Sequence, residues 1–156
     1  MTAVIVTVGA STITVAVDHD VHVVPVGIDL LADGELHHDP PRPEELTNAI
    51  GFVTDHLDDL IRELPAMVGL EMHLHGPVIE AVAGVEVGAA PDLPFVLSRD
   101  AAEDVFRTLA TESAGDRARN PGLLREHVAV VVSGCCIVVA LMRRLQLDRV
   151  TIGATR

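Results

Sequence analysis

The first 26 residues contain three short apolar runs separated by tight polar turns, and this pattern constrains the fold most. Ala3–Val8 is almost entirely apolar, as in a central strand buried on both faces. Ser11–Val17 alternates between apolar and polar residues, and Val21–Val26 follows a second polar turn, with Pro25 favouring an edge strand or a bulge. Three successive strands with tight turns predict an antiparallel meander.

One long amphipathic helix is predicted after the meander. Asp29–Arg42 is polar and rich in proline, which predicts an irregular connection. Pro43 suits the first position of a helix, and apolar residues then recur every three or four positions until Pro65 ends the pattern. These apolar residues are Leu46, Ile50, Val53, Leu57, Leu60 and Leu64.

The remainder of the chain predicts further strands and helices in alternation. Gly76–Ala83 is predicted to be a fourth strand, and Ser98 is a plausible N-cap for a helix over Arg99–Thr111. Arg125–Leu145 is predicted to be a buried helix, and Val150–Ile152 a final strand. The order predicts one α/β domain over residues 1–156. It would have a mixed five-stranded sheet covered by helices, as in ribonuclease-H-like, actin-type domains.

The composition excludes several classes of partner. Eleven basic residues, all of them arginine, face 23 acidic residues, so the net charge is −12 and no nucleic-acid or anionic-membrane partner is expected. Aromatic residues make up 2% of the chain, too few for a base-stacking platform. The absence of lysine excludes a Walker phosphate loop.

The sequence also predicts a cytoplasmic protein. The apolar run Val128–Met142 is shorter than the roughly 20 residues that a membrane-spanning helix needs. The N-terminus lacks the basic region of a signal peptide. Cys135 and Cys136 are adjacent, which makes an intrachain disulfide implausible and suggests two small core side chains.

Four segments in this order resemble the second actin-like domain of the exopolyphosphatase/guanosine pentaphosphate phosphohydrolase (Ppx/GppA) family. The resemblance implies a cleft between two such domains, in which glycine-rich turns hold a phosphate chain and acidic residues position a metal ion and the attacking water. It further implies hydrolysis of a terminal phosphoanhydride in polyphosphate or guanosine pentaphosphate. The segments are Val6–Thr12, Val24–Leu46, Leu97–Arg99 and Asn120–Leu145.

The family's phosphate turn, Asp-Ile-Gly-Gly-Gly-Ser-Thr-Glu, is only partly present. Gly9, Ala10, Ser11 and Thr12 are the phosphate-binding candidates that the resemblance implies, whereas Thr7 stands at the leading aspartate and Ile13 at the closing glutamate. A second turn is expected over Ala83–Gly88 and adds Gly84 as a candidate. The family's Arg-Ala-Asp motif is replaced by His127-Val128-Ala129, and the first domain, which supplies the catalytic glutamate, has no counterpart.

These departures predict binding with little or no hydrolysis. No residue is assigned as catalytic and none as a metal ligand, and magnesium is expected only if the chain is active. The ligand would be polyphosphate or a guanosine polyphosphate. The alternative is a non-catalytic interaction module that forms a homo-oligomer or pairs with another actin-like domain, such as that of an intact family member.

Three other clusters have two interpretations each. The imidazoles of His73 and His75, and the segment His37-His38-Asp39, could bind zinc or lie in solvent. The acidic residues Asp55, Asp58, Asp59 and Glu63 are typical of a solvated helix face. From Gly115 onward seven arginines face three acids, which could hold an anion or an acidic surface of a second copy, or could simply be solvated. Six of these seven are Arg117, Arg119, Arg125, Arg143, Arg144 and Arg149, and the seventh is Arg156.

Overall fold

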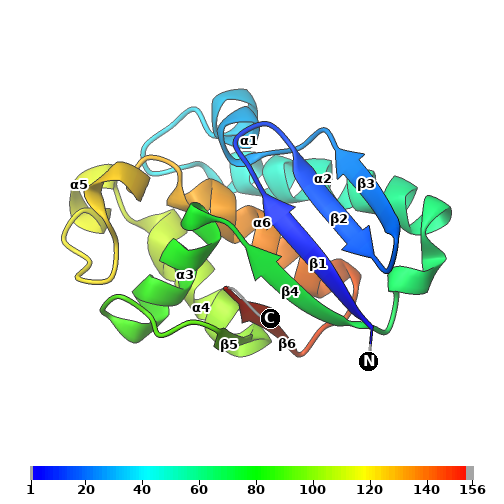
Figure 1. The fold of residues 1–156 in the computed structure, drawn as a ribbon. Coiled ribbons are helices and arrows are strands. Elements are labelled where there is room, and N and C mark those ends of the chain that lie inside the picture. Colours follow the sequence, from blue (N-terminus) through cyan, green and yellow to red (C-terminus); the bar gives the residue numbers. More distant parts are fainter. Residues whose placement is uncertain (1, 154–156) are drawn as a thin grey trace.

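The computed structural model describes residues 2–153, and its centre is a six-stranded mixed sheet (Figure 1). The order is β3-β2-β1-β4-β6-β5, in which β1, β4 and β6 are parallel and the other pairs are antiparallel. The α/β class and the predicted antiparallel meander are confirmed, and the sheet has one strand more than predicted. The strands are β1 Ala3–Val8, β2 Ile13–Val17, β3 Asp20–Val24, β4 Glu71–His75, β5 Phe95–Ser98 and β6 Arg149–Ile152.

Helices cover one face of this sheet (Figure 1). Helix α6 (Val131–Arg144) lies at the centre of that layer between α2 (Pro43–Glu63) and α4 (Arg99–Thr111), and it is buried from Val131 through Met142. Alternate residues of the strands, among them Val4, Val6 and Leu74, are fully buried on the same side. The remaining helical segments are α1 Ile28–Glu35, α3 Pro77–Val87, α5 Ala114–Arg117 and the 3₁₀ turns Pro65–Met67 and Arg125–His127.

The opposite face of the sheet stays open. Val21 and Val23 in β3 are 63% and 64% exposed, and Val96 in β5 is 59% exposed. Ile5 and Ala16 lie between them in register and are half-buried. In Figure 1 this face looks toward the viewer, with α2 and α6 behind it. The sheet therefore presents a partly apolar surface to solvent.

The predicted strand over Gly76–Ala83 is wrong. The strand β4 ends at His75, and Gly76, at a φ of 139°, turns the chain into helix α3. Its valines and isoleucine favour a strand locally, but Pro77 suits the first helical position. Burial of Ile79 and the following residues against α6 then decides in favour of the helix.

Further boundaries differ from the prediction, and neither β4 nor β5 is among the predicted strands. The predicted irregular connection Asp29–Arg42 contains α1, which begins at Ile28 and packs on α2 and α6. The last helix begins at Val131 rather than Arg125, after a 3₁₀ turn. Strand β5 is short and lies at the edge of the sheet, where packing against β6 rather than a local pattern specifies it.

The two cysteines are buried side by side in α6. Neither forms a disulfide, and burial raises the pKa of both thiols, that of Cys136 to about 12. No helix among residues 2–153 is both long enough and apolar enough to span a bilayer.

Glu45 fixes the segment that leads into α2. Its carboxylate accepts hydrogen bonds from the backbone N–H of Arg42 at 2.8 Å and of His37 at 2.9 Å, and its Oε2 lies 3.0 Å from Nδ1 of His38. These contacts, the Arg42 N–H foremost, lower the pKa of Glu45 to about 2.

Substitution Glu45→Gln is therefore expected to remove part of the pH dependence of unfolding. Because the pKa of Glu45 is lower in the folded chain than its usual value of 4.5, the carboxylate stabilises the fold above pH 4.5, and this stabilisation is lost as pH falls toward 2. Urea unfolding midpoints between pH 2.5 and 6 should fall less steeply in Glu45→Gln than in the unchanged chain. Glu44→Gln, at the exposed neighbouring position, is the matched control and should keep the original slope.

Candidate phosphate-binding site

The turn Gly9–Thr12 follows β1 at the carboxyl end of the parallel strands, where ligands of open α/β sheets bind. The N–H of Gly9 donates to the carbonyl of Thr12 at 2.9 Å, which closes the turn. The carbonyls of Gly9 and Ala10 accept from the first N–H groups of α1, those of Ile28 and Asp29, each at 2.9 Å. These bonds also satisfy helix donors that would otherwise lack a partner.

This arrangement leaves three consecutive backbone donors of the turn without a hydrogen-bond partner among the described residues. Ala10, Ser11 and Thr12 are exposed, and none of their backbone N–H groups donates a hydrogen bond to another described residue. The hydroxyls of Ser11 and Thr12 add two further donors. Consecutive free N–H groups with adjacent hydroxyls form an anion-binding concavity, so the turn has the donor set that a phosphate group requires.

A second turn reaches the same end of the sheet from β4. An added Cβ on Gly76 would lie 2.6 Å from the carbonyl oxygen of Val8, the residue before Gly9, so glycine is required here both by this approach and by its positive φ. Helix α3 starts directly afterwards, and the N–H groups of Val78 and Ile79 have no acceptor among the described residues. Its positive end therefore lies next to the Gly9 turn.

The first turn of α6 packs against the start of α1 and the start of α3. The hydroxyl of Ser133 is buried and donates to the carbonyl of Ile28 at 2.6 Å. An added Cβ on Gly134 would lie 2.8 Å from Cγ1 of Val78. The start of α6 thus packs against the starts of α1 and α3, which fixes the two turns relative to each other.

The predicted second phosphate turn over Ala83–Gly88 is wrong, because these residues belong to α3 and the position at its end. Gly84 is buried in the helix, and an added Cβ would lie 2.4 Å from the carbonyl of Gly122. Its role is close packing of a loop. The turn that does follow β4 is formed by Gly76, which was not among the predicted binding residues. A Gly-Pro pair directly after the alternating run around Met72 and Leu74 was the available signal.

The strand positions next to Thr7 hold no carboxylate that could bind magnesium. Thr7 pairs with Thr14 of β2 and with His75 of β4, so a hydroxyl and an imidazole occupy the positions next to it in the sheet. Magnesium is bound through carboxylates and phosphates, and this set contains no carboxylate. Within residues 2–153 no group of three or more His, Cys, Asp or Glu side chains could hold a metal ion.

The predicted basic region does not form one anion site, because several of its arginines have acidic partners of their own. Arg117 is 5% exposed, and its guanidinium lies 3.3 Å from the carboxylate of Asp39. Arg143 pairs with Glu103 through two bonds of 2.7 and 2.8 Å, which lower the pKa of Glu103. Further pairs are Arg144 with Asp58 and Arg119 with Asp116; no acidic partner is found for Arg125 or Arg149 among the described residues.

The histidine clusters lie in separate places. His73 and His75 lie on one face of β4, whereas His37 and His38 contact Glu45 before α2. The acidic residues of α2 lie toward the surface, where Asp59 pairs with Arg62.

Comparisons with known proteins identify proteins that share this fold. No family model and no curated protein matches the sequence. Among solved structures, the Aquifex aeolicus Ppx/GppA phosphatase matches with a TM-score of 0.87 and 18% identity, over 97% of this chain and 53% of its own. The chain has the fold of one domain of Ppx/GppA proteins.

Two further structures agree with this assignment. An exopolyphosphatase-like protein matches with a TM-score of 0.89 and 14% identity, over 98% of this chain and 54% of its own. An exopolyphosphatase from Cytophaga hutchinsonii matches with a TM-score of 0.82 and 12% identity, over 98% and 53%. The chain therefore spans about half the length of the Ppx/GppA structures that it resembles, and its actin-like ATPase fold agrees with the sequence-based prediction.

Proposed function

We propose that the chain is a Ppx/GppA-type phosphate-binding domain that holds polyphosphate or a guanosine polyphosphate at the Gly9–Thr12 turn, with weak or no phosphoanhydride hydrolysis on its own. The observation that carries the proposal is the set of free N–H groups of Ala10, Ser11 and Thr12 beside the start of α3. Weak hydrolysis follows from the side chains around Thr7, which lack the carboxylates that would place a metal ion and water.

Calorimetric titration with polyphosphate and with guanosine pentaphosphate, each with magnesium, tests the proposal. Thr12→Val removes a hydroxyl without changing side-chain size, and it is expected to weaken binding about 3- to 10-fold, the effect of one lost hydrogen bond. Thr47→Val, on the exposed surface of α2, is the matched control and should bind as the unchanged chain does. Absence of heat at millimolar ligand would rule out this function. Rapid metal-dependent release of orthophosphate from either ligand would contradict the proposal that hydrolysis is weak or absent.

A second candidate function is self-pairing through the open face of the sheet. Val21 and Val23 in β3 and Val96 in β5 are exposed at the two edges of that face, and the chain spans only about half of the proteins that it resembles. An apolar surface of this kind is typical of an interface, and a second copy of the chain offers an equivalent surface.

Light scattering over a range of concentrations tests the second candidate. The double variant Val21→Thr, Val23→Thr keeps β-branched residues in β3 and is expected to shift a dimer toward the monomer. A double substitution on α2, Thr47→Ser with Thr54→Ser, serves as the control and should leave the dimer unchanged. A monomer at every concentration contradicts self-pairing, and complex formation only with an intact Ppx/GppA protein assigns the face to that partner instead.

A further inference from the structure

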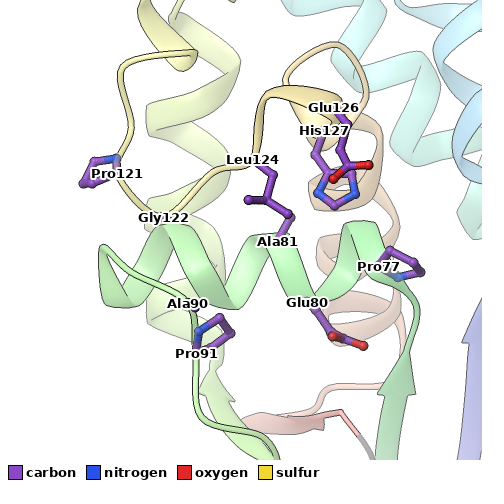
Figure 2. A pocket seen from close by; sticks show the side chains of 10 residues that line it. All are labelled: Pro77, Glu80, Ala81, Ala90, Pro91, Pro121, Gly122, Leu124, Glu126 and His127. Carbon is purple, nitrogen blue, oxygen red and sulfur yellow. The ribbon is translucent and has the colours of Figure 1, made fainter.

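A cavity of about 360 Å³ lies beside α3, on the side reached by residues 121–127 (Figure 2). Its volume lies within the range of small-molecule sites in proteins. Most of its wall is apolar, formed by residues such as Ala81, Pro91, Pro121 and Leu124. The apolar part of a ligand would therefore leave water when it enters the cavity, and this favours binding.

Three side chains give the cavity its polar character. Glu126 and His127 lie together on one side of α3, and Glu80 projects from the other (Figure 2). The Nδ1 atom of His127 is buried and has no hydrogen-bond partner among the described residues. In a neutral imidazole with its proton on Nε2, the Nδ1 atom is an acceptor. A buried acceptor without a partner is costly, so this atom marks a position where an N–H group of a ligand would supply the missing bond.

The charge of the lining favours a cation. Two carboxylates and no arginine line the cavity. Neither the carboxylate of Glu80 nor that of Glu126 takes part in a hydrogen bond or ion pair within residues 2–153. The positive end of α3, where Glu80 lies, is equivalent to only about half a unit charge and offsets a small part of the two carboxylates. The cavity therefore attracts a cation and repels an anion.

A metal ion does not match this arrangement. Metal ions in proteins are held by several ligands that converge on one point, whereas Glu80 and Glu126 lie on different sides of α3 (Figure 2). A metal ion would also leave the apolar wall without a partner. A cation with an apolar body satisfies both the carboxylates and the wall.

We infer that the cavity binds a small organic ammonium ion, namely a protonated primary amine on a compact apolar body. An ammonium group has three N–H donors and no acceptor, which matches the adjacent carboxylate of Glu126 and Nδ1 of His127. The apolar body packs against Leu124 and the prolines of the wall. This ligand is opposite in charge to the phosphate compounds proposed for the Gly9–Thr12 turn, so the two sites can be tested separately.

Calorimetric titration at pH 8 with three ligands that share one ring tests the inference. The ligands are cyclohexylmethylamine, cyclohexylmethanol and cyclohexanecarboxylate, which carry a positive, a neutral and a negative head group. The amine is expected to bind at least about fivefold more tightly than the alcohol, the ratio that one ion pair of about 1 kcal/mol gives, and the carboxylate should bind most weakly. Equal affinities for the amine and the alcohol, or no heat with the amine at millimolar concentration, would overturn the inference.

Two variants place the ammonium group at Glu126 and His127. Glu126 is exposed and has no partner to lose, so Glu126→Gln should fold normally, weaken binding of the amine about 3- to 5-fold and leave binding of the alcohol unchanged. His127→Phe keeps a ring but removes Nδ1, and it should weaken binding of the amine about 3- to 10-fold without lowering Tm, because Nδ1 makes no bond in the free chain.

Glu86→Gln is the matched control, since it makes the same charge change on α3 at an exposed position outside the cavity. It should bind the amine as the unchanged chain does. Equal affinities of Glu126→Gln and Glu86→Gln for the amine would place the amine elsewhere and overturn the inference. Heat with polyphosphate but none with the amine overturns the amine site alone, and heat with the amine but none with any phosphate ligand supports it while overturning the proposed function.

Discussion

Gly27→Ala is expected to destabilise the chain by about 3 kcal/mol, at the upper end of what overpacking costs, and to abolish phosphate binding at the turn. An added Cβ at position 27 would lie 2.4 Å from the backbone carbon and oxygen of Ala10. Backbone atoms cannot rotate away as a side chain can, so the turn must move off α1. Its carbonyls would then lose their bonds to the start of that helix.

Thermal unfolding and phosphate titration measure the two effects separately. A loss of about 3 kcal/mol corresponds to a fall of about 6–12 °C in Tm for a chain of this size. Gly34→Ala, near the other end of α1, is the control, because a Cβ there meets no atom within 4 Å. It should be neutral or stabilising by about 0.5 kcal/mol. An unchanged Tm and unchanged affinity in Gly27→Ala would contradict the packing of the turn on α1.

Gly122→Ala is expected to destabilise the chain by a similar amount, about 3 kcal/mol, but to leave the phosphate turn intact. Its Cβ would lie 1.8 Å from the carbonyl oxygen of Gly84, inside α3. The loop that carries residues 120–127 would have to separate from α3, which would open the cavity between them. The variant should therefore keep the affinity of the Gly9–Thr12 turn for polyphosphate.

Urea unfolding of Gly122→Ala gives the stability, and Gly51→Ala is the control. Gly51 lies in α2 with no atom within 4 Å of an added Cβ, and alanine there should stabilise the helix by about 0.5–1 kcal/mol. A Gly122→Ala chain as stable as the Gly51→Ala chain would contradict the close contact between the loop and α3.

Segments with a strong local pattern were predicted correctly. The meander, the helix that begins at Pro43 and the helix over Arg99–Thr111 each have a periodicity or cap that is readable without the rest of the chain. The predicted N-cap at Ser98 is present, since its hydroxyl accepts the N–H of Ala101 at 3.1 Å. In these segments the local sequence pattern favours the same secondary structure as burial in the core does, so the pattern alone predicts it.

The prediction failed where contacts between distant segments decide the structure. Residues 77–87 have the composition of a strand, but they fold as a helix whose buried residues pack against α6. Helix α1 is fixed by contacts with distant segments: its first N–H groups donate to the carbonyls of Gly9 and Ala10, which lie about twenty positions earlier in the chain, and Ile28 and Leu31 are buried.

In the candidate site too, some parts were predicted from a local pattern and others depend on contacts between distant segments. The Gly9–Thr12 turn is continuous in sequence and could be selected from its residues, and its binding of phosphate stays a prediction. Gly76 and the cavity beside His127 could not be located in this way, because they arise from the packing of β4 against β1 and of residues 121–127 against α3.

The adjacent thiols in α6 have a practical consequence for measuring how this chain opens. Both cysteines are enclosed by the helical layer, and their raised pKa values keep them protonated at neutral pH, whereas the thiolate is the form that reacts with disulfide reagents. A chromogenic thiol reagent would therefore react only with molecules in which the central helix has come away from its neighbours. The chain carries a native reporter of large-scale opening, one that requires no introduced label.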